Sequence, residues 1–177
     1  VIRPADANET SEAWKAAITR RNGPTALILS RQSLPTIDRS IYASASNLNR
    51  GAYILADIGI GKPELILMAS GSEVHLILQA AIKMTTDIKC IRVVSFPSWD
   101  LFKDQGKEYQ SKVFPENGTP RMAVEMGVSQ GWERWVGSKG STICIDHFGA
   151  SAPANILFEK FGFTVENIIL KVQELIK

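Results

Sequence analysis

The chain has 177 residues, enough for one ordinary domain or for one domain and part of another. Hydrophobic residues make up 45% of it, a globular composition, and 20 basic side chains nearly balance 18 acidic ones, for a net charge of +2. The Lys and Arg residues are also scattered, so the charge gives no reason to expect nucleic acid or an anionic membrane as a partner.

The two cysteines, Cys90 and Cys144, each lie in an apolar run and form neither a metal-ligand spacing nor a disulfide framework. This usage favours a reduced, cytoplasmic setting over secretion. No apolar run approaches the roughly 18 residues of a membrane-spanning helix, and no signal peptide is recognisable. Because the chain opens on Val1 in an apolar, strand-like stretch, we expect a fragment that lacks an N-terminal part.

The first segment has the pattern strand, helix, strand. Asp6 and Glu9 have the spacing of a capping box, in which each carboxylate satisfies a free amide of the first helical turn. Gly23 and Pro24 then end the helix, and the run TALILS (25–30) is typical of a strand buried on both faces. Between cap and stop, apolar side chains recur at helical spacing, at Ala13, Trp14, Ala17 and Ile18.

A polar stretch rich in Ser and Asn follows over residues 34–50, without sustained periodicity. A structureless stretch of this length is uncommon within one domain, so we interpret it as an interdomain linker. The predicted division is therefore residues 1–35 as the end of one α/β domain, 36–50 as the linker, and 51–177 as a second domain.

The second domain alternates between strands and helices. Strands are predicted over 52–55, 64–69, 89–95, 121–125 and 142–146. Helices are predicted over 72–85, about 104–113, 130–136, 153–161 and 164–176, and the last has an apolar stripe behind a Thr164 cap. This alternation predicts an α/β fold with three layers, in which helices cover both faces of a mostly parallel, mixed sheet.

A Gly-x-Ser-x-Gly motif at Gly127, Ser129 and Gly131 has the strand–turn–helix context of a serine hydrolase nucleophile. Such a site needs an acid and then a histidine later in the chain. Only His147 follows, and its neighbour Asp146 points to the opposite side of the strand end. We therefore favour a structural role, in which the glycines permit a tight turn, Ser129 caps the helix, and Trp132, Trp135 and Val136 face the core.

The turn at 68–81 (MASGSEVHLILQAA) leads into a helix whose free amides could bind phosphate, but it lacks the glycine pattern of a nucleotide site. Ser70 and Glu73 have the spacing of a capping box instead. His75 is predicted on the solvated face of this helix. His147 lies where a strand ends, but without a partner in sequence we favour a structural role for it.

Arg31 directly follows the TALILS run, so it is predicted at the carboxyl edge of a parallel strand, where open α/β sheets bind ligands. A guanidinium held there suits bidentate capture of a phosphate. The residues alone favour a surface or ion-paired arginine, and both interpretations stay open at this point.

Five stretches together resemble the transketolase family, and their order and spacing cover nearly the whole chain. They are VIRPADANE (1–9), GPTALILSRQSLP (23–35), ASGSEV (69–74), RVVSFPS (92–98) and FGASAP (148–153). The resemblance implies that residues 1–35 end the pyrimidine-binding domain and that 51–177 form the C-terminal domain. It also implies that Arg31 contacts the phosphate of a sugar phosphate.

The resemblance further implies an activity: transfer of a two-carbon ketol unit between sugar phosphates by a homodimer that uses thiamine diphosphate and Mg²⁺. The family's Gly-Asp-Gly motif for the metal and diphosphate does not occur here. We therefore expect this chain alone to bind no cofactor or metal and to be inactive. Two alternatives remain, a paralogue such as dihydroxyacetone synthase and an oligomerisation or regulatory module without a site of its own.

Overall fold

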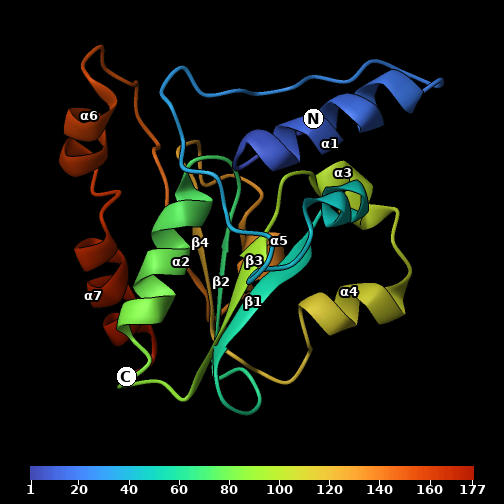
Figure 1. Ribbon diagram of the computed structural model, residues 1–177. Helices are drawn as coiled ribbons and strands as arrows, with labels where there is room; N and C mark the ends of the chain where they lie inside the picture. Colours follow the sequence, from blue (N-terminus) through green and yellow to red (C-terminus); the bar gives the residue numbers. More distant parts are fainter.

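The computed structural model describes all residues, 1–177. A five-stranded sheet lies at its centre (Figure 1), formed by β1 (Tyr53–Gly59), β2 (Leu65–Ala69), β3 (Cys90–Ser95), β4 (Arg121–Val124) and β5 (Ser141–Ile143). The strand order is β1-β3-β2-β4-β5, and only β1 runs antiparallel to its neighbour. The predicted mixed, mostly parallel sheet is confirmed.

Helices cover both faces of this sheet, which confirms the three layers. On one side lie α2 (Glu73–Lys83) and α7 (Val165–Leu175), and α6 (Ala154–Lys160) lies above α7 in the view of Figure 1. On the other lie α3 (Trp99–Lys103), α4 (Lys107–Val113) and α5 (Glu133–Val136). None of the helices combines the length and hydropathy that crossing a membrane requires.

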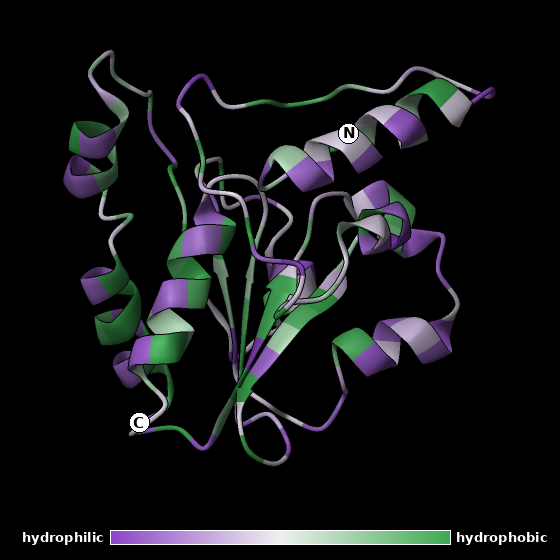
Figure 2. Cartoon of the chain, in the orientation of Figure 1, coloured by the Kyte–Doolittle hydropathy of each residue, from purple (hydrophilic) through white to green (hydrophobic).

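The strand β2 shows how the sequence fills both sides of the sheet. Leu65 and Leu67 join the core under α2 and α7, whereas Ile66 and Met68 join an aromatic core under α3 to α5. All residues of β2 are buried. This is the pattern expected of a central parallel strand. In Figure 2, hydrophobic residues (green) occur along the central strands and on the helices that cover them.

Several boundaries differ from the prediction. Strand β1 extends to Gly59, past the predicted 52–55, and α5 begins at Glu133 rather than at residue 130. The helix predicted over about 104–113 begins at Lys107, and a separate short helix that was not predicted, α3, precedes it. Ser98 caps α3 by accepting a hydrogen bond from the Leu101 amide at 3.4 Å. Strand β5 ends at Ile143 rather than at residue 146, because the Ile145 amide donates to the Gly127 carbonyl at 2.7 Å and leaves the ladder.

The helix of the first segment, α1 (Ala7–Thr19), begins as predicted: Asp6 accepts a hydrogen bond from the Glu9 amide at 2.8 Å. Its apolar face is mostly uncovered, with Trp14 52% and Ile18 66% exposed. The helix extends away from the sheet in Figure 1.

The prediction of a doubly buried strand over residues 25–30 is wrong. The run forms a single parallel bridge, between Ile2 and Leu27, and Ile28 and Leu29 are 49% and 51% exposed. Leu27 packs against a small cluster that includes Ala13 of α1, but Ile28 and Leu29 remain about half exposed, so the run is not buried on both faces.

The stretch predicted as a linker is irregular but firmly packed. Ile37 and Leu48 are buried, and residues 45–50 form the short 3-10 helix η1 (Ala45–Arg50). The Ile37 amide and the Arg39 guanidinium both donate to Asp6, at 2.9 and 3.0 Å. Polar composition therefore marks irregular backbone here rather than a free connection.

Candidate functional site

A large cleft lies at the carboxyl ends of β2 and β4, the edge at which open α/β sheets bind ligands. Its volume is about 640 Å³. Its walls come from Arg3 and Pro4, residues 28–32, the start of α2, and the loop and helix that follow β5. Segments far apart in the sequence thus meet around one opening.

Arg31 lies in the wall of this cleft, so the structure brings the predicted site residue to the sheet edge. Its side chain is exposed and forms no hydrogen bond or ion pair within the chain. The neighbouring cation, Arg3, is by contrast fully engaged with two carboxylates. Arg31 is therefore the free positive charge of the cleft.

Arg3, in the cleft wall, belongs to a largely buried charged cluster. Its guanidinium donates to Glu73 at 2.5 Å and to Glu125 at 2.8 Å. Glu73 is the first residue of α2, and Glu125 directly follows β4. Burial raises the pKa of Glu125 to about 7, and Arg3 opposes this shift.

The same cluster overturns the capping box predicted for Ser70 and Glu73. The Ser70 hydroxyl donates to Glu125 at 2.7 Å, and the Glu73 carboxylate accepts from the Met126 amide at 2.9 Å as well as from Arg3. Buried partners on distant segments satisfy these groups in place of the local helix end. Glu125 lies at the end of a predicted strand. A strand end was also the signal that placed Arg31 at a sheet edge, so the sequence could have pointed to Glu125 as well.

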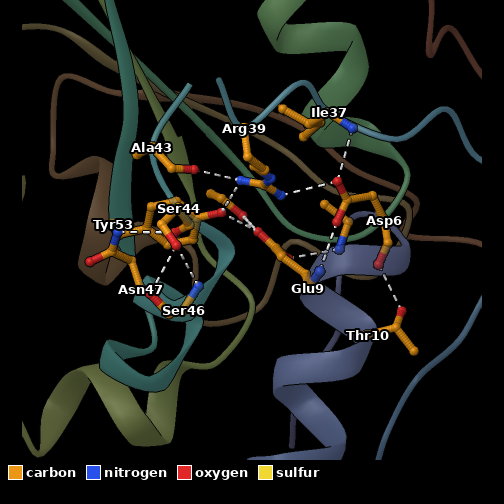
Figure 3. Close-up of polar contacts among 12 residues, drawn as sticks. Asp6, Glu9, Thr10, Ile37, Arg39, Ala43, Ser44, Ser46, Asn47 and Tyr53 are labelled. Carbon is orange, nitrogen blue, oxygen red and sulfur yellow. Dashed lines mark hydrogen bonds and ion pairs between the residues drawn. The ribbon is translucent and has the colours of Figure 1, made fainter. Parts of the chain in front are cut away.

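A second polar cluster ties α1 to the sheet (Figure 3). Glu9 is fully buried and accepts hydrogen bonds from the hydroxyls of Tyr53 and Ser95, both at 2.6 Å. Arg39 donates to the Tyr53 hydroxyl at 2.9 Å and to Asp6. Burial raises the pKa of Glu9. Sequence reasoning assigned Asp6 and Glu9 only to the helix cap and missed this network, because its partners lie far along the chain.

The serine hydrolase interpretation finds no support in the geometry. The Ser129 amide donates to Asp146 at 2.8 Å, and His147 Nδ1 lies 2.8 Å from the Phe148 carbonyl, so no histidine contacts the serine hydroxyl. The predicted Ser129 side-chain cap is wrong, since the Trp132 amide bonds to the Ser129 backbone carbonyl instead.

The structural role of the glycine motif is otherwise confirmed. Gly131 has a φ of +93°, and a Cβ there would lie 2.8 Å from the Trp99 ring. Trp132, Trp135 and Val136 are buried, as predicted.

The solvated position predicted for His75 is wrong. Its Nε2 atom is buried and has no hydrogen-bond partner, and burial lowers its pKa. The backbone near Ala5 and Pro35 lies against this face of α2, so the helix surface that looked solvated in sequence is half covered.

The chain's own residues do not fit a metal–diphosphate site. No group of three or more His, Cys, Asp or Glu side chains is arranged to hold a metal ion, and the Gly-Asp-Gly motif is absent from the sequence. Both cysteines are free thiols.

Comparison with known proteins gives one consistent family. Residues 51–164 match the family described as transketolase-like C-terminal domain, and residues 1–36 match the transketolase pyrimidine-binding domain. The chain is 49% identical over 176 residues to the transketolase of Aquifex aeolicus and 45% identical over 177 residues to that of Halalkalibacterium halodurans. These alignments cover 98% and 100% of the chain but 25% and 26% of the relatives, so the chain spans about a quarter of their length.

Solved structures agree. Transketolase from Leishmania mexicana superposes on 98% of the chain with a TM-score of 0.88 and 38% identity, and the chain covers 24% of it. Transketolase from Campylobacter jejuni gives a TM-score of 0.81 at 30% identity, over 98% of the chain and 26% of that structure.

Proposed function

Since the chain belongs to the transketolase family, we propose that it is part of an enzyme that transfers a two-carbon ketol unit from a ketose phosphate to an aldose phosphate. The family matches cover both of its parts and support this proposal. The reaction is proposed for a homodimeric, cytoplasmic enzyme that uses thiamine diphosphate and Mg²⁺. This chain is proposed to supply none of the residues that bind the cofactor or the metal. Residues 1–35, 36–50 and 51–177 are proposed as the end of the pyrimidine-binding domain, the linker and the C-terminal domain.

Arg31 is the residue of this chain that we assign to the substrate, as the ligand of the sugar phosphate group. The observation that carries this proposal is a contrast between two arginines in one cleft. Two carboxylates neutralise Arg3, whereas Arg31 is exposed and unpaired. A planar guanidinium with free donors matches a phosphate in bidentate geometry.

The phosphate is remote from the carbons that react, so binding it stabilises substrate and transition state equally. Removing Arg31 should therefore raise KM for phosphorylated sugars and leave kcat nearly unchanged. Loss of a charge-assisted hydrogen-bonded pair corresponds to roughly a ten- to hundredfold rise in KM. Sugars without a phosphate should be converted as before.

The test is a kinetic comparison of the enzyme that contains this segment, with xylulose 5-phosphate as donor and ribose 5-phosphate or unphosphorylated glycolaldehyde as acceptor. Arg31→Ala is compared with Arg21→Ala, an exposed arginine outside the cleft wall. A KM effect confined to phosphorylated sugars and to Arg31→Ala supports the assignment. Equal losses on both acceptors would refute it.

The isolated chain is proposed to be inactive in ketol transfer even with thiamine diphosphate and Mg²⁺ added. Turnover of xylulose 5-phosphate by the chain alone would contradict this. The positive control is the longer enzyme that contains this segment, which must be active under the same conditions.

A further inference from the structure

A second hollow lies on the other side of the sheet, among α4, α5 and the start of β4. Its volume is about 400 Å³. Three cationic side chains line it, Lys107, Arg121 and Arg134, against a single carboxylate, Glu116. None of the three cations forms an ion pair within the chain. An opening with this charge excess favours an anion.

Arg121 is unusual among the arginines of the protein. Four arginines are partly buried, and three of them, Arg3, Arg39 and Arg92, pair with carboxylates at 3.0 Å or less. Arg121 forms no such ion pair; burial lowers its pKa, and the nearby Glu116 opposes this shift. A partly buried charge without a carboxylate in contact is costly, so the position is suited to an anion that comes from outside the chain.

The Arg121 guanidinium is also held in place. It donates to the backbone carbonyls of Pro115 and Trp135, at 2.8 and 3.0 Å, and it lies 5.4 Å from the centre of the Phe114 ring. These acceptors are neutral, so they fix the orientation without cancelling the charge. A guanidinium oriented in this way is preorganised for an oxyanion.

One polar group beside Arg121 is also unsatisfied. The indole Nε1 of Trp135, a residue that lines the hollow, is buried without a hydrogen-bond partner. A buried donor without a partner is rare in folded proteins and points to a missing acceptor. The Ser111 hydroxyl, in the same wall, is exposed and makes no hydrogen bond within the chain, so it is available to a ligand.

We propose that this hollow binds a small oxyanion, a phosphate or carboxylate group, with Arg121 as the fixed anchor and Lys107 and Arg134 as exposed, movable partners. Arg121 is the first residue of β4, whereas the Arg31 cleft lies beyond the last residue of that strand. The two sites are thus at opposite edges of the sheet, and this proposal does not depend on the proposed function.

The test is titration of the whole chain with inorganic phosphate and, separately, with citrate, at constant ionic strength set by chloride. The indole N–H signal of Trp135, assigned with Trp135→Phe, reports the site by NMR. Lys107→Ala combined with Arg134→Ala should weaken binding at least tenfold, since both side chains are exposed and their loss should not affect folding. Arg21→Ala, at an exposed arginine that does not line the hollow, should leave binding unchanged.

Glu116→Gln provides a variant that gains binding. It removes the one carboxylate of the hollow, so affinity should rise by about two- to fivefold, the range of a single exposed charge interaction. Binding of only one of the two probes identifies the anion as phosphate or carboxylate. If neither probe shifts the Trp135 signal, or if Arg21→Ala weakens binding as much as the double variant does, the proposal is overturned.

Discussion

The tripeptide Leu-Ile-Leu occurs three times in this chain, at 27–29, 65–67 and 76–78. The third copy lies in α2. The first two both lie in runs predicted as strands, yet they adopt different structures. The second begins β2, hydrogen-bonded to β3 and β4 and buried between two helical layers. The first makes one bridge, to Ile2, and exposes about half of Ile28 and Leu29.

The difference shows what an apolar run specifies. Such a run favours an extended backbone and gains free energy on burial, but the strands beside it and the helices above it must come from elsewhere in the chain. Residues 65–67 have those partners within 51–177, and residues 27–29 do not. The experiments below test this contrast, from the largest expected effect to the smallest.

The most direct test replaces the matching leucine of each of these two copies by alanine. Leu67→Ala should lower the free energy of unfolding by about 2–5 kcal/mol, since it opens a cavity in the core. Leu29→Ala should change it by less than about 0.5 kcal/mol, because that side chain is already half exposed. Denaturation by urea measures both, and equal losses would contradict the contrast.

The attachment of α1 to the sheet should depend on Glu9. Glu9→Ala leaves the buried hydroxyls of Tyr53 and Ser95 without their acceptor, at a cost of about 3 kcal/mol. Faster amide hydrogen exchange should be confined to residues 7–19, with the sheet unchanged. Glu12→Ala, which removes a surface pair with Lys15, is the matched control and should have little effect.

The charged cluster at Arg3 should make stability depend on pH. The pKa of Glu125 is about 7 in the folded state and near 4.5 when unfolded, so between these values only the folded state holds the proton. Stability should therefore fall by about 2 kcal/mol as pH rises from 4.5 to 7. The difference between the unfolding profiles of the native chain and Glu125→Gln isolates this contribution, and parallel profiles would contradict it.

Arg31 should be the least important of these residues for stability. Its side chain is exposed and unpaired, so Arg31→Ala should alter the free energy of unfolding by less than about 0.5 kcal/mol. A larger loss would mean that the residue has a structural role, which would weaken its assignment to substrate.

The predictions that succeeded concern elements whose pattern is local. The stripe of α7 buries Ile168 and Val172 as expected, and Thr164 caps the helix by accepting from the Asn167 amide at 3.2 Å. The sheet class also followed from the order of the segments. Arg31 lies in the cleft wall, but the buried strand on whose end it was predicted is absent. Periodicity and chain order are read directly from sequence, which is why they were reliable.

The predictions that failed concern partners. Glu73 was assigned to its own helix end but pairs with Arg3, which lies 70 positions away. His75 was placed in solvent, although the backbone near Pro35 lies against it. Local spacing contains no information about which distant segment arrives at a given surface.

The sequence by itself determined the α/β class, the positions of most helices and strands and the transketolase resemblance, because each depends on residues near one another or on motifs in order. The tertiary structure decided which of the two strand-like Leu-Ile-Leu runs is buried, which partners bind the carboxylates of Glu9 and Glu125, and which arginines stay free. Those outcomes depend on burial and pairing between distant segments, whose free energies arise only when the chain is folded.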